Sequence, residues 1–470
     1  YVDRPTYVEL PSEMRSPGHC GRLLRCMYGT KSAATRWEDT YTRALGRLGF
    51  AQGRASPCCF AHKSRDLKVV VHGFDFTVLG RDEDLDYFQH GIRGELDVKV
   101  RGRLGSGRND GKCMRILNRI VRWTDAGLRI EADPRHVEIL IKEMGLGEAN
   151  AVKTPGVKDR EKGEHGEQPL DKAEASMYRS CVARANYLAQ YRADIAYAVK
   201  EACRDMANPT ASSWEKVKRV VRYLKGEPRV VYECNWQNYE GITVYVDTDW
   251  AGCFKTRKST SGGAIMRGGH LLKHWSSTQQ TIALSSGEAE LKGIVKGAAE
   301  GLGLQSVGKD LNISYDVHVY TDSSAAMGMV ARKGMGKVRH IEVGELWIQD
   351  AVRNKALTVH KVKGDDNPAD ILTKYHVDLS PEAIVVSNCM CSCFLFIARI
   401  QEGLEGCVRV FPSVWEDLGD SWGIYESLGG VVRALRTWEM FGKYWDLLRS
   451  RRFWQDLYAA GRTHESLVVA

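Results

Sequence analysis

Between residues 242 and 377 the sequence alternates between patterns typical of strands and patterns typical of helices. Residues 242–249 alternate apolar and polar side chains with a period of two, and residues 261–266 and 270–275 flank Gly268 and Gly269 like the arms of a hairpin. A long helix is expected after Ser285 and Ser286, a further strand over 317–321, and a short helix near Asp322. This alternation predicts an α/β or α+β domain of about 135 residues.

The rest of the chain divides less clearly. Residues 154–175 are rich in glycine, proline and charge without apolar periodicity, which predicts a linker. Apolar residues recur every three or four positions over 177–206, which predicts helical structure. Ser212 is expected to cap a further helix that ends at Gly226. With 470 residues the chain is long enough for about three domains.

Composition excludes several classes of protein. A hydrophobic share of 43% with 27% charged residues argues against collagen-like, coiled-coil and wholly disordered chains. No apolar run reaches the ~18–20 residues that span a bilayer, so no membrane contact is expected. The 13 cysteines include no pair of Cys-x-x-Cys units, so we expect reduced thiols in an intracellular protein rather than a structural zinc site. The first residues do not resemble a signal peptide, and we expect the chain to be a fragment of a longer protein.

Four carboxylates of the 242–377 region lie where active sites are usually built. Asp247 lies in the first strand, Asp322 follows the strand 317–321, and Asp370 opens a short final helix. Glu288 and Glu290 both open the long helix but face different sides of it. Glu290 is the better candidate, because it lies on the helix stripe that contains Ile294, Gly297 and Gly301, whose small residues allow close approach to a sheet.

Such a set of carboxylates has a chemical use. Two Mg²⁺ ions about 4 Å apart clamp the attacking water and the leaving oxygen of a phosphodiester, and hard cations require clustered oxygen ligands. Taken singly, each of these residues is better explained as a cap or turn residue than as a metal ligand.

Seven ordered blocks of sequence carry a resemblance to a known family. They are residues 245–253, 258–263, 275–280, 284–291, 320–326, 339–342 and 367–374. Together they resemble the ribonuclease H domain that closes the Pol polyprotein of copia-type LTR retrotransposons. The resemblance implies that Asp247, Glu290, Asp322 and Asp370 are catalytic residues that bind two Mg²⁺ ions, for which Mn²⁺ can substitute. Asp249 and Glu288 would then be neighbours of the site rather than ligands.

The resemblance extends upstream to the reverse transcriptase of the same family. Residues 24–38 are similar to its Leu-Tyr-Gly-Leu-Lys-Gln block, and residues 178–199 to its connection to the nuclease. The catalytic hairpin of the family carries Asp-Asp, whereas this sequence reads His72-Gly-Phe-Asp, so that Phe74 replaces the first Asp and Asp75 remains. We therefore expect a degenerate polymerase site, and DNA synthesis is not expected.

These observations predict a multidomain α/β and α+β chain. Residues 1–110 would form the C-terminal part of degenerate reverse transcriptase fingers and palm, 111–238 a thumb- or connection-like region, and 239–377 a ribonuclease H-like fold with a mixed five-stranded sheet and helices. Residues 378–470 stay unassigned; Leu435, Trp438, Phe441, Trp445 and Leu448 recur at threes and fours, which predicts a mostly helical tail.

The expected function is hydrolysis of the RNA strand of RNA–DNA hybrids. The net charge of +8 arises mainly from the first half of the chain, where Arg101, Arg103 and Lys112 are candidate nucleic-acid contacts. A solvated basic face explains those three residues equally well. Arg339 and His340 are candidate phosphate contacts in the nuclease region, and other Pol or retroelement proteins are possible partners. The alternative is a catalytically silent nucleic-acid-binding remnant.

Overall fold

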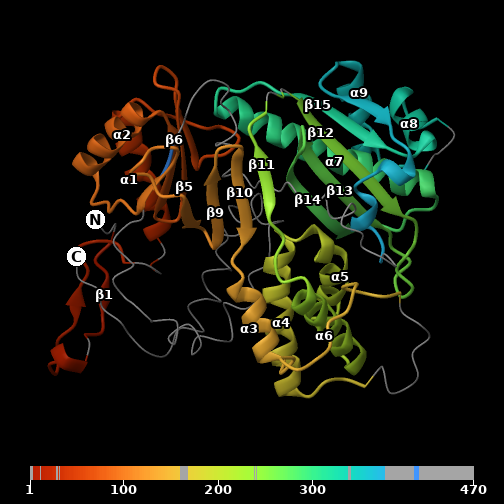
Figure 1. Cartoon of the computed structure of the whole chain (residues 1–470), viewed down its shortest axis with the longest axis horizontal. Helices are drawn as coiled ribbons and strands as arrows, with labels where there is room; N and C mark the ends of the chain where they lie inside the picture. Colours follow the sequence, from red (N-terminus) through yellow and green to blue (C-terminus); the bar gives the residue numbers. More distant parts are fainter. Residues whose placement is uncertain are drawn as a thin grey trace. The chain divides into compact units, whose positions relative to one another are not determined.

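The computed structural model describes residues 4–10, 12–27, 30, 32–158, 168–237, 239, 241–336, 340–375 and 407–411 (Figure 1). The chain divides into two compact units. The first unit contains Tyr1–Ala51, Phe88–Val98 and Val414–Ala470, and the second contains Gln52–Tyr87 and Lys99–Ser413. Among the described residues, no helix has both the length and the apolar character needed to cross a bilayer.

The first unit is small and mostly helical where it is described. Strands β1 (Tyr7–Val8) and β2 (Gly21–Arg22) pair antiparallel, and helix α1 spans Ala33–Arg47. Helix α2 (Asp82–Glu95) crosses the boundary between the units. Within the first unit Phe50 packs edge-on against Phe88, and the Arg47 guanidinium pairs with Glu95.

The second unit opens with antiparallel strands. Strands β4 (Cys59–His62), β5 (Leu67–His72) and β6 (Asp75–Gly80) lie side by side, followed by β17 (Cys407–Phe411) and β7 (Gly102–Leu104). The predicted helical tail, apart from β17, lies outside the described residues. A separate four-stranded sheet has the order β11-β10-β9-β8 and is formed by Tyr232–Asn235, Gly127–Ala132, Arg119–Thr124 and Cys113–Ile116.

Four helices lie in the sequence between these strands and a five-stranded sheet. They are α3 (Arg135–Glu143), α4 (Lys172–Ala189), α5 (Ala193–Arg204) and α6 (Ala211–Gly226). Helix α4 begins within the predicted linker, because the Asp171 side chain accepts a hydrogen bond from the Glu174 backbone in a capping box. Helix α6 is capped by Thr210, two residues before the predicted Ser212.

The mixed five-stranded sheet that the sequence predicts is present in residues 241–361. Its order is β14-β13-β12-β15-β16, formed by His270–Thr278, Thr260–Arg267, Gly241–Asp249, Asp316–Thr321 and Thr358–Lys361. Strands β12, β13 and β14 are antiparallel neighbours, whereas β15 and β16 run parallel to β12. The predicted fold class is confirmed in this region.

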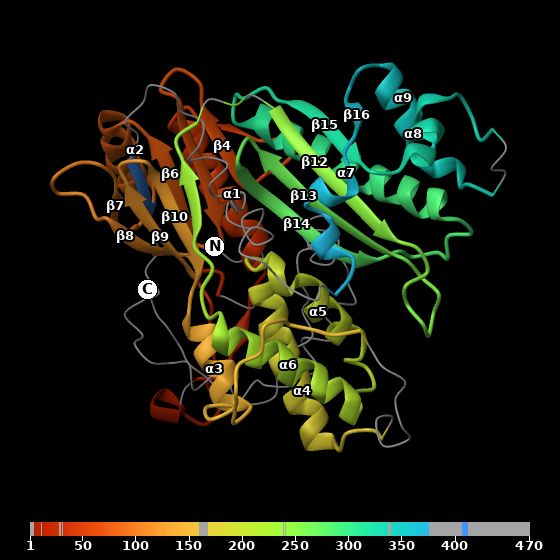
Figure 2. The same ribbon diagram turned by 45° about the vertical axis from the view of Figure 1, so that its right-hand side comes forward.

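Helices cover this sheet (Figure 2). The long helix α7 (Ser286–Asp310) is capped by Ser285 and packs on β12 and β15, with α8 (Ser324–Ala331) and α9 (Trp347–Arg353) beyond it. Helix α5 packs on β14 and on the 3-10 turn η5 (Asp370–Leu372). The sheet and its helices share one apolar core that includes Val244, Val246, Ile294 and Val319.

Candidate metal centre

The strand register brings the first two carboxylates together. Strand β12 pairs parallel with β15, and Tyr245 lies opposite Tyr320. Asp247 follows Tyr245 by two residues and Asp322 follows Tyr320 by two residues, so both acids lie at the same edge of the sheet. Parallel strands present their carboxyl ends at one edge, which is why two residues separated by 75 positions in the sequence become neighbours.

Glu290 reaches the same place from helix α7 because that helix lies very close to the sheet. A Cβ atom added to Gly293 would come within 2.6 Å of the Thr248 methyl, and one added to Gly297 would come within 2.4 Å of Val246. Only glycine fits at such separations. Gly297 of the predicted stripe and the neighbouring Gly293, which was not part of it, therefore lie on the surface that packs on β12, and Glu290 on the same helix faces Asp247.

The three carboxylates form a compact cluster. One ligand oxygen each from Asp247, Glu290 and Asp322 lies within 4.8 Å of the others. Burial, with the Asp247 and Asp322 charges added, raises the pKa of Glu290 to about 8. Burial also raises the pKa of Asp247, and the charges of Asp370 and Asp322 act in the same direction. Three carboxylates this close need either a proton or a cation to offset their repulsion.

The donor set fits a hard divalent cation. Glu290 Oε2 is buried and has no hydrogen-bond partner among the described residues. Oxygen-only ligands are the set that Mg²⁺ and Mn²⁺ take, and a buried acceptor without a donor is costly unless a ligand satisfies it. Asp247, Glu290 and Asp322 are therefore the residues able to hold such an ion.

Asp370 lies near this cluster but is not one of its three members. Its Oδ1 pairs with Lys374 Nζ at 2.5 Å, and its charge is felt at Asp247. The same turn reaches the site through two other residues, since the buried Thr373 hydroxyl donates to Asp247 Oδ2 at 2.5 Å and Asn367 Nδ2 donates to the Val246 carbonyl at 2.9 Å. Sequence reasoning missed Thr373 and Asn367, although both belong to the 367–374 block.

The neighbouring acids do not join the cluster. Glu288 receives hydrogen bonds or ion pairs from Lys292, His340 and the Leu284 backbone. Asp249 accepts from the Thr260 backbone N–H. His340, a candidate phosphate contact, thus pairs with Glu288 at 2.9 Å, while Arg339 lies outside the described residues.

Two of the basic candidates upstream make internal contacts. Arg103 pairs with Asp82 and Asp110, and Lys112 Nζ donates to the carbonyls of Gly105 and Ser106 at 2.7 and 3.0 Å. Arg101 precedes β7 at an exposed position. Lys112 therefore closes the glycine-rich loop around residues 105–107, which is a structural role.

The predicted polymerase hairpin is formed by β5 and β6. His72 pairs with Asp75, so Gly73 and Phe74 make a two-residue turn, and Gly73 has a φ of 58°. Phe74, the residue expected to replace the first Asp of the family's hairpin, lies in this turn. Among the described residues, the cluster at Asp247 is the one group of three or more acids, histidines or cysteines placed to share a metal ion, and neither Phe74 nor Asp75 belongs to it.

Known proteins resemble this chain in sequence and in structure. It is 25% identical over 399 residues to the retrovirus-related Pol polyprotein from transposon TNT 1-94 of Nicotiana tabacum, covering 79% of this chain and 28% of that protein. It is 27% identical over 363 residues to the Pol polyprotein from transposon RE2 of Arabidopsis thaliana, covering 76% of this chain and 24% of that protein. The chain thus spans about a quarter of the length of these relatives. No protein-family model matches it.

Solved structures show weaker likeness. A foamy viral protease–reverse transcriptase in complex with double-stranded DNA aligns over 74% of this chain and 62% of its own, with 9% identity and a TM-score of 0.42. The N-terminal RNase H domain of a Mycobacterium tuberculosis protein aligns over 32% of this chain and 96% of its own, with 16% identity and a TM-score of 0.22. The fold assignment therefore rests on the strand order described above. In sequence, this chain is a homologue of retrovirus-related Pol polyproteins of copia-type transposons, over about three quarters of its length.

Proposed function

We propose that residues 239–377 hydrolyse the RNA strand of RNA–DNA hybrids with two divalent metal ions. The observation that carries this proposal is the cluster of Asp247, Glu290 and Asp322, whose ligand oxygens lie within 4.8 Å of one another at one edge of the sheet. The homology to Pol polyproteins supports an RNA–DNA hybrid as substrate, because copying RNA into DNA leaves such hybrids. Asp370 completes the proposed set from the adjacent turn.

Each residue has a distinct task in this proposal. Bound Mg²⁺ or Mn²⁺ supplies an activated water and a Lewis acid for the leaving oxygen. Asp247 is oriented by the hydrogen bond from Thr373, so its free oxygen keeps one direction. Glu290 holds a proton while its neighbours are uncompensated and must release it when a cation binds. Asp322 supplies a carboxylate from the position directly after β15, close to Asp247.

The first part of the chain is proposed to have lost polymerase activity. Phe74 places an apolar ring where the family has a metal-binding carboxylate, and such a ring cannot ligate a hard cation. Asp75 alone does not supply the several oxygen ligands that two ions share. The catalytic activity of the chain is thereby assigned to the cluster in the five-stranded sheet.

The direct test is cleavage of a labelled hybrid by the full chain and by Asp322→Asn. The substitution keeps the shape of the side chain and removes its charge, so turnover should fall at least about 100-fold while hybrid binding persists. Asp316→Asn, an exposed change at the start of the same strand, is the matched control and should cleave like the parent.

Two results would contradict the proposal. Equal cleavage by the parent and Asp322→Asn would exclude the metal cluster as the catalytic centre. A parent chain that binds the hybrid but does not cleave it with Mg²⁺ or Mn²⁺ would favour the alternative, a silent nucleic-acid-binding remnant.

A further inference from the structure

Two histidines of the five-stranded sheet point at one hydroxyl group. His318 lies on β15 and His360 lies on β16, and the strand register places Thr358 opposite His318. His318 Nδ1 lies 2.7 Å from the Thr358 hydroxyl oxygen, and His360 Nε2 lies 2.7 Å from the same oxygen. The two ring centroids are 5.7 Å apart. Imidazole nitrogens from two neighbouring strands therefore converge on a single point.

This point lies on the face of the sheet that is turned away from helix α7. Successive residues of a strand point to opposite faces, and on β15 it is Val317 and Val319 that join the core shared with α7. His318 and Tyr320 therefore lie on the other face, where both are partly exposed, as is His360 on β16. Water has access to the two histidines from this face.

Aromatic packing holds the His360 ring in place. Tyr320 stacks on it with 5.0 Å between ring centroids and 28° between ring planes. Tyr245, on the next strand β12, lies 5.3 Å from Tyr320 between centroids and extends the row of rings across three strands. A ring that is already held in position loses less rotamer freedom when it binds a ligand. The pair is thus partly organised before a ligand arrives.

The geometry of the two nitrogens suits a metal ion. The hydroxyl carries one proton, so it donates to one imidazole and accepts from the N–H of the other, whereas a metal ion takes a lone pair from both neutral rings. Bonds from imidazole nitrogen to such metals are about 2.0–2.1 Å long, so each nitrogen needs to approach the common point by about 0.6–0.7 Å. Thr358 is exposed, and its hydroxyl can leave that point by a change of rotamer.

The chemistry of the ligands selects the metal. Imidazole nitrogen suits late first-row transition metals, whereas Mg²⁺ and Mn²⁺ prefer oxygen ligands. Among the described residues, no third acid, histidine or cysteine joins the two histidines in a metal-binding group, so water takes the other coordination positions. Two nitrogens together with oxygen donors form the tetragonal set that is typical of Cu²⁺ and Ni²⁺. The histidine pair and the carboxylate cluster therefore favour different ions.

We propose that His318 and His360 form a second metal site, which binds a divalent transition-metal ion such as Ni²⁺, Cu²⁺ or Zn²⁺ and ties β16 to β15. Strand β16 is the edge of the sheet and pairs with β15 through four residue pairs (Figure 2). An ion bonded to one histidine of each strand adds a link that the unfolded chain lacks, and it therefore stabilises the folded state. This inference goes beyond the proposed nuclease function and does not depend on it.

Titration of the full chain with Ni²⁺ at about pH 7.5 tests the site, because a metal ion binds the neutral imidazole. Excess Mg²⁺ fills oxygen-only sites, and Ni²⁺ is the probe because it does not oxidise thiols as Cu²⁺ does. Calorimetry should show that this Ni²⁺ site is lost in His318→Gln and in His360→Gln. Thr358→Val removes the hydroxyl that competes for both nitrogens, so it should bind Ni²⁺ at least as tightly as the parent.

The matched control is His62→Gln, in a different sheet. The Nδ1 of His62, on β4, lies 3.4 Å from the Ser64 hydroxyl, so this residue is also a histidine beside a hydroxyl group. It should keep the Ni²⁺ binding of the parent. Urea midpoints give a second measurement: Ni²⁺ should raise the midpoint of the parent, of Thr358→Val and of His62→Gln by more than that of either variant of the pair.

Four results would overturn the proposal. Parental Ni²⁺ binding in either His318→Gln or His360→Gln would show that the two histidines do not share an ion. An equal loss in His62→Gln would show that the effect is not specific to the pair. Loss of binding in Thr358→Val would show that the hydroxyl, rather than the convergence of the nitrogens, makes the site. Tight Ni²⁺ binding without a rise in the parent's urea midpoint would exclude the link between the strands.

Discussion

Glu290 is a residue at which the demands of folding and of metal binding oppose each other. Its carboxyl group is turned toward two other acids, and one of its oxygens lacks a hydrogen-bond partner in the described part of the chain. In the absence of a cation this arrangement costs free energy whenever the group is ionised. The arrangement follows from the close approach of helix α7 to β12 at Gly293 and Gly297, which brings Glu290 up to the edge of the sheet.

The pKa of Glu290 yields a prediction about stability. It rises from an ordinary 4.5 to about 8 in the fold, so the folded chain holds this proton more tightly than the unfolded chain. In EDTA, the contribution of this group is therefore fully present below about pH 4.5 and is lost as the pH rises toward 8. Glu290→Gln should remove that loss, making the variant more stable than the parent at pH 8.5 by on the order of 1–3 kcal/mol.

Urea midpoints at pH 5 and pH 8.5 measure the effect, with Asp316→Asn as the control. Mg²⁺ should reverse the ranking at pH 8.5, because a bound cation stabilises the ionised carboxylate of the parent and has less to bind in the variant. Parallel pH dependence in parent and Glu290→Gln would show that the acids do not interact as the structure places them.

At the scale of elements, local patterns predicted most of the five-stranded sheet. The period of two in β12, the glycines between β13 and β14, and the serine cap of α7 are local signals, and each element formed close to its expected place. The choice of Glu290 over Glu288 also came from helical phase, and Glu290 is the one that faces Asp247. These features are determined by residues close together in the sequence, so they can be predicted from a single sequence.

Other features depended on contacts that sequence patterns do not carry. Strand β16 has four residues with no clear alternation of apolar side chains, and it forms because β15 offers a parallel edge. The exclusion of Asp370 from the three-acid cluster follows from the path of η5 and from its pairing with Lys374. The sequence pattern did not predict the start of α4, because its capping box lies within a charged, proline-containing stretch.

The β5–β6 hairpin leads to a prediction about polymerisation. Phe74→Asp should not give primer extension on a primed RNA or DNA template, although it restores the family's acidic pair in sequence. Two neighbouring acids on one tight turn supply too few ligands for two ions, and no third acid joins them in the described residues. Synthesis by Phe74→Asp above a no-enzyme blank would show that a polymerase site survives; the parent chain and Asp75→Asn are the controls.

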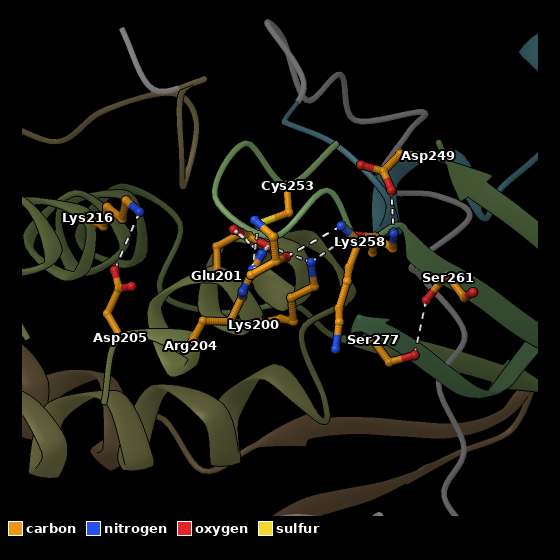
Figure 3. A network of polar contacts seen from close by, with 12 residues as sticks. Lys200, Glu201, Arg204, Asp205, Lys216, Asp249, Cys253, Lys258, Ser261 and Ser277 are labelled. Atoms are coloured by element: carbon orange, nitrogen blue, oxygen red, sulfur yellow. Dashed lines mark hydrogen bonds and ion pairs between the residues drawn. The ribbon is translucent and has the colours of Figure 1, made fainter. Parts of the chain in front are cut away.

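Within the second unit, the five-stranded sheet and the preceding helix α5 share side-chain packing. Tyr191, Ala193 and Ala196 share the apolar core of the sheet, and Tyr197 packs edge-on against Tyr375 at 4.8 Å between ring centroids. Helix α5 therefore contributes to the surroundings of η5, and its Arg204 guanidinium also donates to Cys253 Sγ in the segment that follows β12 (Figure 3). The geometry of the candidate metal centre depends on segments outside the 239–377 region that carries its acids.

His274 makes this dependence sensitive to pH. It lies on β14, its Nε2 is 2.8 Å from the Ala189 carbonyl at the end of α4, and its Nδ1 is buried without a partner among the described residues. Burial lowers the pKa of His274 to about 4. The neutral ring donates through Nε2, whereas a protonated ring would also bury a charged N–H with no acceptor.

The sign of the resulting prediction follows from proton binding. Between about pH 6.5 and pH 4 the unfolded chain binds a proton at this position and the folded chain does not, so stability falls as the pH falls through that window. Acidification from pH 7 to pH 4.5 should therefore destabilise the parent by about 1–3 kcal/mol more than His274→Gln, whose amide N–H can still donate to the Ala189 carbonyl. Other carboxylates titrate in the same range, so the difference in stability between the parent and His274→Gln is the quantity to measure, by urea midpoints at each pH.

The control is His318→Gln, at a partly exposed position on β15, whose stability should follow that of the parent. An equal acid sensitivity of parent and His274→Gln would mean that the contact between β14 and α4 is not what acid disrupts.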